Sequence, residues 1–268
     1  MRRSTFIWAS ILILAGLLLL LNNIGLIAVD VWGLIWPLFL IAFGGSILWG
    51  VFFGRPSFEA ERVAIPLEGA ARARVLVKHA AGRLRVDASA TSGELVTGTF
   101  SGGLDHRERR DVDVLNVEMR VPGRAFPGFA WPWMWGPGRT LDWTFGLNAE
   151  IPLSLEFETG AGEARLNLSD LHVTDLRLKT GASATDLTLP AHAGHTRVKI
   201  DAGAASVTVR VPAGVAARIR ATGGLMSVNV DRNRFPREGN VYRSLDYETA
   251  TNKVDIEIEA GVGSISMR

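Results

Sequence analysis

One short pattern recurs through the C-terminal half of the chain: a run of small residues followed by alternating apolar residues. The glycines that open these runs are Gly160, Gly181, Gly203 and Gly223, at intervals of 21, 22 and 20 residues. A fixed interval of this size is typical of stacked repeats, in which each unit buries its apolar face only against its neighbours. The repeat therefore predicts a scaffold, and it carries little information about chemistry.

The segments between the small-residue runs have the period-two alternation of β-strands, and helical periodicity is scarce. An antiparallel sandwich would contain similar strands, but it would not place equivalent turns every 20 to 22 residues. We therefore expect a single β-solenoid at 69–268, with small-residue turns between its strands. The expected inward-facing pairs are Leu166/Leu168, Leu176/Leu178, Leu187/Leu189, Val198/Ile200, Val207/Val209, Val228/Val230 and Ile265/Met267.

Other local expectations concern the start of this region. Residues 55–68 are expected to be a linker, because Pro56 and Pro66 interrupt a continuous helix. Residues 112–114 read as a strand, and the charged stretch 106–111 reads as an exposed turn.

The first 54 residues have a different composition. Asp30 is the only charged residue from Ser4 to Gly54, and apolar runs flank it at about 6–28 and 31–53. A helix needs about 20 apolar residues to cross a bilayer. We predict a two-helix transmembrane hairpin, so the fold class is a membrane-anchored all-β protein. A signal peptide followed by one anchor is the alternative, but no convincing cleavage site follows Leu21.

The basic residues that flank the two spans predict their orientation. Arg2 and Arg3 precede the first span, Arg55 and Arg62 follow the second, and the connection between the spans has no basic residue. The positive-inside rule then places both termini and the β domain in the cytoplasm.

Two parts of the chain resemble a known family. Residues 16–26 and 36–44 resemble the transmembrane region of LiaI/LiaF-type bacterial envelope-stress proteins. Residues 169–176 and 180–183 resemble the toast-rack β-solenoid that follows such regions, and 101–103 and 117–120 fit its first half. The resemblance implies a bacterial inner-membrane protein that senses membrane stress beside two-component histidine kinases, and it brings no catalytic residues.

A Trp-rich segment at 123–138 interrupts the strand pattern. It contains three prolines and four glycines, which exclude a regular strand or helix. Its aromatic residues are Phe126, Phe129, Trp131, Trp133 and Trp135. Three interpretations stay open: a cover over an open end of the solenoid, insertion at the bilayer interface, or a protein-binding hot spot.

A second interruption is the polar insertion at 231–252, which stretches the interval between Gly223 and Gly261 to 38 residues. It contains the candidate contact residues Arg234, Arg237 and Arg243. The simplest interpretation is a solvated insertion. The alternative is a docking loop, because insertions in solenoids often carry binding.

Several function classes are disfavoured. Net charge is +2, from 29 basic and 27 acidic residues, so nucleic acid is not an expected partner. Cysteine is absent, and His192 with His195 is a weak metal signal. Motifs for phosphate loops, serine nucleophiles and HExxH zinc sites are missing. We expect no catalytic, cofactor or metal site.

The leading prediction is a non-enzymatic sensor or scaffold in envelope-stress signalling. Its expected partners are the lipid bilayer and a histidine kinase or another membrane stress protein. One alternative is a structural solenoid that associates with further copies of itself through its open ends. The other is an extracytoplasmic adhesin-like module, which requires the opposite topology.

Overall fold

The computed structural model describes residues 37, 40–41, 44, 60–123 and 141–268. The two predicted spans lie outside these residues except for Pro37, Leu40, Ile41 and Gly44, which are helical. Within the described part of the chain, no helix has the length and apolar character needed to cross a membrane. The aromatic residues of the Trp-rich segment also lie outside the described residues.

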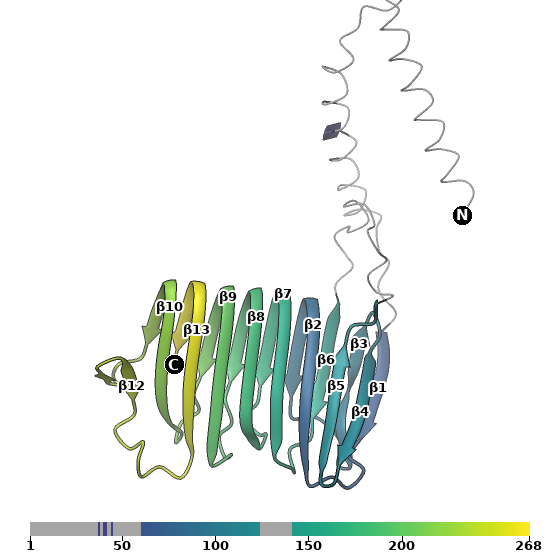
Figure 1. The fold of residues 1–268 in the computed structure, drawn as a ribbon, viewed down its shortest axis with the longest axis horizontal. Helices are drawn as coiled ribbons and strands as arrows, with labels where there is room; N and C mark the ends of the chain where they lie inside the picture. The colour runs from purple at the N-terminus through teal and green to yellow at the C-terminus, as the bar shows by residue number, and fades with distance from the viewer. Residues whose placement is uncertain (1–36, 38–39, 42–43, 45–59, 124–140) are drawn as a thin grey trace, which may run out of the picture. The chain divides into compact units, whose positions relative to one another are not determined.

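The described residues form thirteen strands that belong to one hydrogen-bonded sheet system (Figure 1). Their bounds are β1 Ala60–Pro66, β2 Arg72–Asp87, β3 Glu94–Ser101, β4 Asp105–Asp111, β5 Val114–Arg120, β6 Asp142–Leu147, β7 Leu153–Asn167, β8 Val173–Thr188, β9 His195–Arg210, β10 Ala216–Val230, β11 Arg237–Glu238, β12 Val241–Arg243 and β13 Lys253–Met267. The domain is therefore all-β, as predicted.

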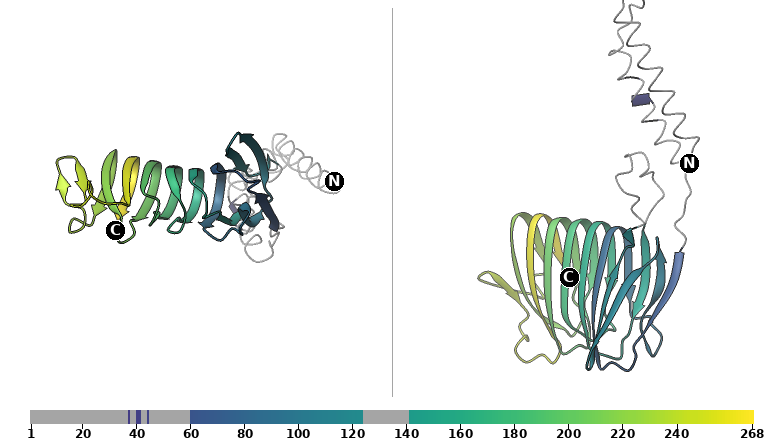
Figure 2. Two further views of the ribbon diagram at one scale, coloured as in Figure 1. Left: turned by 90° about the horizontal axis from the view of Figure 1, so that it is seen from below. Right: turned by 45° about the vertical axis from the view of Figure 1, so that its right-hand side comes forward.

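Each long strand bends once and contributes two arms to the domain. In β7 the buried side chains are Leu153, Leu155 and Phe157 before the bend, and Ala164 and Leu166 after it, with exposed residues between. The step from 157 to 164 is odd, so the inward face changes phase at the bend. The two arms therefore face each other and enclose the core, and the successive arches stand side by side (Figure 2).

The small-residue runs form these corners, so the prediction that they are turns between strands was wrong. Small residues are found at the corners because the stacked backbones approach closely there and hydrogen-bond through the corner in parallel register. A Cβ on Gly181 would lie 2.6 Å from the carbonyl oxygen of Gly160. Gly162 has φ +127°, and its Cβ would lie 2.0 Å from the carbonyl oxygen of Gly82. Only glycine meets both demands.

The arches do not stack in chain order. Their order in the sheet is β2, β7, β8, β9, β13 and β10, so the last strand of the chain lies between two earlier ones. β13 pairs in parallel with β9 and with β10 along both arms. The polar insertion makes this order possible, because it carries the chain from the end of β10 back to the start of β13.

Both ends of the row of arches carry additional strands. The first arm of β10 pairs with β12, which pairs with β11, and both short strands come from the polar insertion. At the other end, the first arm of β2 pairs with β5, which pairs with β4. The second arm of β2 pairs with β6, which pairs with β3, and β3 pairs with β1.

Three local expectations at this second end need correction. Part of the expected linker 55–68 is strand β1, because it pairs along its length with β3. The charged stretch 106–111 belongs to edge strand β4, which buries no side chain and therefore lacks apolar alternation. Val112 is in a hairpin turn with φ 52° and is 86% exposed, so the predicted strand begins only at Val114.

The predicted inward-facing residues are buried, with one exception. Thirteen of the fourteen lie in the core, and Val228 is only half-buried. Val228 lies on the second arm of β10, and no described strand covers the outer edge of that arm. Its partial exposure follows from its place at the end of the row.

We expect Gly162→Ala to lower the free energy of unfolding by about 3–5 kcal/mol, because it adds backbone strain to a steric clash with Gly82. Gly194→Ala is the control: Gly194 also has positive φ, but a Cβ there meets no atom within 4 Å. Its cost should be about 1 kcal/mol. Urea denaturation measures both values, and equal losses would contradict the close-approach explanation.

Candidate functional site

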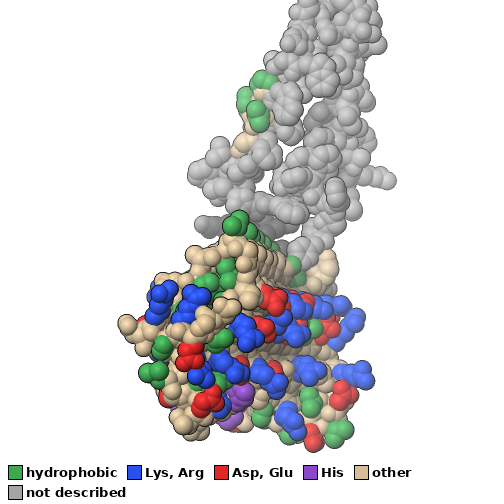
Figure 3. Space-filling model, turned by 60° about the vertical axis from the view of Figure 1, so that its left-hand side comes forward, with side chains coloured by type: hydrophobic (Ala, Val, Ile, Leu, Met, Phe, Trp, Pro, Cys, Tyr) green, Lys and Arg blue, Asp and Glu red, His purple; other side chains and the backbone are tan. Residues whose placement is uncertain are grey.

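The outer face of the first arms carries rows of charged side chains that run across the strands (Figure 3). Parallel register creates these rows, because residues at equivalent positions become neighbours on adjacent strands. One row is Arg74, Ser154, Asp175, Arg197, Asp255 and Arg218, and the next is Leu76, Glu156, Arg177, Lys199, Glu257 and Arg220. The signs alternate along much of each row.

Many of these charges are paired. Lys179 Nζ lies 2.8 Å from Glu156 and 2.9 Å from Glu158. Its hydrogen bonds to these two carboxylates raise the pKa of Lys179. Lys199 Nζ lies 3.2 Å from Glu259 on β13. Exposed pairs of this kind contribute little stability individually. Their collective effect is a face on which positive and negative charge largely compensate.

A shallow groove of about 920 Å³ runs over this face. Six basic and four acidic residues line it: Arg74, Arg177, Arg197, Lys199, Arg218 and Arg220, with Glu156, Asp175, Asp255 and Glu257. The excess of two positive charges is small for a surface of this size. The groove therefore does not have the strongly basic character that a polyanion site requires.

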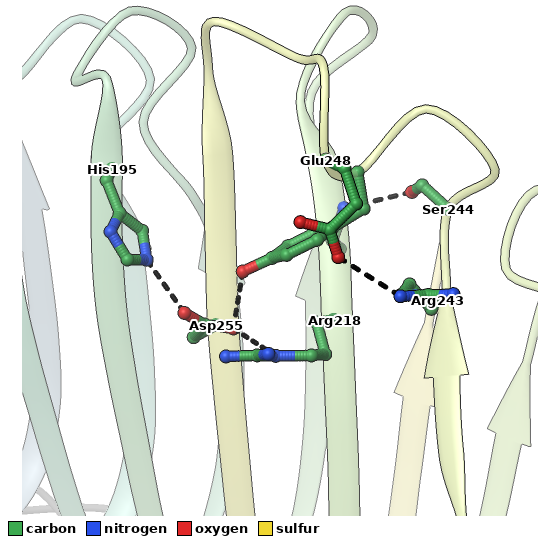
Figure 4. A network of polar contacts seen from close by, with 8 residues as sticks. His195, Arg218, Arg243, Ser244, Glu248 and Asp255 are labelled. Carbon is green, nitrogen blue, oxygen red and sulfur yellow. Dashed lines mark hydrogen bonds and ion pairs between the residues drawn. The ribbon is translucent and has the colours of Figure 1, made fainter. Parts of the chain in front are cut away.

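The densest polar cluster of this face is centred on Asp255 of β13 (Figure 4). Arg218 Nε of β10 donates to Asp255 Oδ1 at 2.6 Å, and the hydroxyl of Tyr247 donates to the same oxygen at 2.6 Å. His195 Nε2 of β9 lies 2.7 Å from Oδ2. We call these four residues the Asp255 cluster.

Burial and hydrogen bonding act in opposite directions on Asp255. Burial alone would raise its pKa, but the hydrogen bonds from Tyr247, His195 and Arg218 outweigh burial and hold the pKa below its usual value. Burial, followed by the hydrogen bond to Asp255, raises the pKa of Tyr247 to about 12. The hydrogen bond to Asp255 also raises the pKa of Arg218. At neutral pH Asp255 is thus ionised, and Tyr247 and Arg218 keep their protons.

The Asp255 cluster joins three strands and the polar insertion. The Tyr247 ring is buried, with the Arg218 guanidinium 5.2 Å and the Lys253 ammonium 5.6 Å from its centroid. Cations over an aromatic face are attracted by its quadrupole. The hydrogen bonds to Asp255 connect β9, β10 and the polar insertion to β13, so this arrangement holds β13 between β9 and β10.

The three candidate arginines of the polar insertion make contacts within the domain. Arg234 is half-buried and donates to the carbonyl oxygens of Val211, Pro212 and Val215. Arg237 Nε donates to the carbonyl oxygen of Gly239 at 2.9 Å. Arg243 pairs with Glu238 at 2.9 Å and with Glu248 at 3.1 Å. These contacts position the three side chains on the polar insertion, and their role as partner contacts stays a prediction.

Leu141 and Asp142, which follow the Trp-rich segment in the chain, contact the corner of β2. His79 is buried, and its Nε2 lies 2.9 Å from the carbonyl oxygen of Leu141. Burial lowers the pKa of His79, so the neutral ring donates this hydrogen bond. Arg83 next to the corner pairs with Asp142 at 2.7 Å. The roles of Phe126, Phe129, Trp131, Trp133 and Trp135 stay predictions.

Sequence reasoning missed the Asp255 cluster. Asp255 and His195 are 60 residues apart, and Asp255 reads only as an outward position in an alternating strand. The signal that could have found the cluster is a carboxylate placed between basic residues on both neighbouring strands. Recognising those neighbours requires the strand order. Among the described residues, no group of three His, Cys, Asp or Glu side chains is arranged to hold a metal ion.

The fold and its surface define a β-solenoid module. Residues 55–210 match the model of the N-terminal domain of toast_rack (DUF2154), and residues 6–48 match the LiaI-LiaF-like transmembrane region. The first match covers more than half of the chain. The chain belongs to the toast_rack family, and its second match makes it a LiaF-like, membrane-anchored member.

One solved structure has a similar fold. A crystal structure from Clostridium sporogenes ATCC 15579, described as a "putative cell adhesion protein", is 24% identical with a TM-score of 0.70. The match covers 78% of this chain and 98% of that one. A "putative adhesin" from Bacteroides fragilis NCTC 9343 is 8% identical with a TM-score of 0.31, and covers 80% and 99%. No curated protein matches the chain.

We expect Asp255→Asn to lower the free energy of unfolding by about 1.5–3 kcal/mol at neutral pH, because it removes charge-assisted hydrogen bonds from two strands. The pKa of Asp255 is lower in the folded state than the unfolded value of about 3.9. Its stabilisation is therefore present above about pH 4 and is lost as the pH falls through the folded pKa. The difference between wild type and variant should shrink on acidification.

Asp175→Asn is the matched control, because Asp175 occupies the same row and its carboxylate pairs only with Arg197, at 3.4 Å. It is also about half-exposed, so its loss should cost less than about 1 kcal/mol. Urea denaturation at several pH values measures both. Equal, pH-independent losses would show that Asp255 does not hold the strands together.

Proposed function

We propose that this protein is a non-enzymatic sensor or scaffold in bacterial envelope-stress signalling. The transmembrane region holds the β-solenoid at the inner membrane, and the solenoid acts through contacts with a membrane-embedded partner. A two-component histidine kinase, or another membrane stress protein, is the proposed partner class.

The observation that carries this proposal is the order of the two family matches in one chain. The transmembrane match ends at residue 48 and the toast_rack match begins at residue 55. A segment of only six residues separates them, and fully extended it reaches about 20–25 Å. The start of the domain is thus kept near the end of the transmembrane region, where changes in the envelope and in membrane proteins are accessible to it.

The surface of the domain supports a role in binding. The charged rows are compensated by ion pairs, and the Asp255 cluster uses its polar groups to hold strands together. Rigid solenoids present extended surfaces to partners, and their function lies in those contacts. Compensated charges also favour specific partners over general attraction to nucleic acid or polyanions.

The proposal places the domain on the cytoplasmic side, where the signalling part of a histidine kinase lies. The adhesin-like alternative requires the domain outside the cell. The fold similarity to the protein described as a cell adhesion protein does not decide between the two, since at 24% identity it concerns the fold alone.

Leu245→Cys tests this topology, because the native chain has no cysteine and Leu245 is 89% exposed. In intact cells, a membrane-impermeant maleimide should label this variant weakly, and labelling should become strong after the cells are permeabilised. Gel analysis of the labelled protein measures the ratio.

Ser244→Cys is the control at the neighbouring position. Ser244 is 5% exposed, and its Oγ accepts a hydrogen bond from the amide of Ala217. It should react only after denaturation. Strong labelling of Leu245→Cys in intact cells would place the domain outside, contradict the signalling proposal and favour the adhesin-like alternative.

A further inference from the structure

The second arm of β10, residues 222–230, has an open edge. On one side it pairs with β13 from Thr222 to Val230. On its other side β12 covers only residues 218–220 of the first arm, and no described strand continues along the second arm. Backbone N–H and C=O groups at such an edge can pair with an additional strand.

The other outer edges carry residues that discourage strand addition. β4 has the sequence Asp-His-Arg-Glu-Arg-Arg-Asp, and six of its seven residues are exposed. β1 contains Glu61 and Arg62 and ends at Pro66, which has no amide hydrogen. Charged residues and proline are the usual protection of edge strands. Residues 222–230 contain neither, and their sequence is Thr-Gly-Gly-Leu-Met-Ser-Val-Asn-Val.

The open edge also leaves the end of the core incompletely covered. Val228 is half-buried, whereas its partners in the same layer, Ile265 and Val207, are 2% and 1% exposed. Met226 is likewise only partly buried, and Leu225 near the corner is 80% exposed. An added strand with apolar residues in the same alternation would complete this layer.

The outer face beside this edge is uncharged. Ser206, Ser264 and Ser227 form one row across β9, β13 and β10, and Thr208, Ser266 and Asn229 form the next. An incoming strand therefore meets no charge that must lose its hydration, in contrast to the charged rows on the first arms. The open edge, the incompletely covered end of the core and the uncharged outer face all favour an uncharged strand as the ligand.

We propose that the second arm of β10 is a docking site for an uncharged, extended segment of another protein, which adds as a strand and covers Val228 and Met226. Main-chain hydrogen bonds would supply affinity, and the alternating apolar positions would supply specificity. This inference depends on the geometry of β10 and not on the signalling role.

A second copy of this chain fits the edge less well. Head-to-tail association would need β1 or β4 as the complementary edge, and both are protected. Antiparallel pairing of two β10 edges would point the corners of the two domains in opposite directions. Each chain enters its domain at Ala60, which pairs with Ser101 on β3. The residue next to Ser101, Phe100, pairs with Trp143, and Trp143 pairs with Leu84 just after the corner of β2. Ala60 is therefore level with the corners.

The tether limits such a dimer further. Six residues, 54–59, lie between the predicted second span and Ala60, and they reach at most about 20 Å. The nine residues of the second arm extend over about 30 Å. Antiparallel pairing would therefore separate the two entry points by about 30 Å along the strand direction, which is more than one tether spans. This separation favours a different protein as the source of the strand.

The test uses the full-length protein in detergent and a fluorescein-labelled peptide with the uncharged sequence of residues 203–209, the arm of β9 that pairs with β13 in this layer. Fluorescence anisotropy should show saturable binding. Val228→Lys should weaken binding about tenfold or more, because it places a charge where the added strand packs. Asn229→Lys adds the same charge on the outer face and should change binding by less than about twofold.

Hydrogen exchange on the wild-type protein gives a second measurement that does not depend on the variants. Peptide binding should slow exchange at residues 223–230 and leave β4 unchanged. Absent binding, equal effects of the two lysine variants, or protection only at β1 or β4 would overturn the proposal. A dimer in sedimentation that Val228→Lys abolishes and Asn229→Lys retains would assign the edge to a second copy and overturn the partner assignment.

Discussion

The contact on which the rest of the structure depends is backbone against backbone at the corners of the arches. The parallel ladder continues through these sharp bends because neighbouring chains approach closely at small residues. Gly162 above Gly82, and Gly263 above Ala205, show this approach, with carbonyl oxygens 2.0 Å from where a Cβ would stand. Because the corners stack, both arms remain in register, and the inward apolar layers and the outward charged rows follow from that register.

Strand order then determines how the two ends of the domain differ. The chain ends inside the row, with β13 between β9 and β10, and the Asp255 cluster holds these three strands together. The polar insertion pairs through β12 with the first arm of β10 and leaves the second arm open, and its role as a docking loop stays a prediction. The open edge therefore lies at the end of the row of arches farthest from β2.

The repeat predicted the solenoid, and thirteen of the fourteen inward-facing residues expected from it are buried, because burial follows a local alternation that one strand displays by itself. It could not distinguish a corner from a turn, since Gly-Ala-Gly suits both. It also could not order β10 and β13, because Val228 and Ile265 sit in equivalent alternations and either strand could follow β9. The Asp255 cluster and the open edge depend on that order, so they were beyond the sequence. Strand β4 was missed because an exposed edge strand has no apolar pattern.

The strand order is tested most directly by engineered disulfides, since the native chain has no cysteine. Ser206, Ser264 and Ser227 lie in one row on β9, β13 and β10, and the hydroxyls of Ser206 and Ser264 are 3.0 Å apart. Adjacent strands lie about 4.8 Å apart, within disulfide range, and alternate strands lie about 9.6 Å apart, outside it. We expect the double-cysteine variants 206/264 and 264/227 to form disulfides under mild oxidation and 206/227 to form none. An efficient disulfide in 206/227, as chain-order stacking requires, would contradict it.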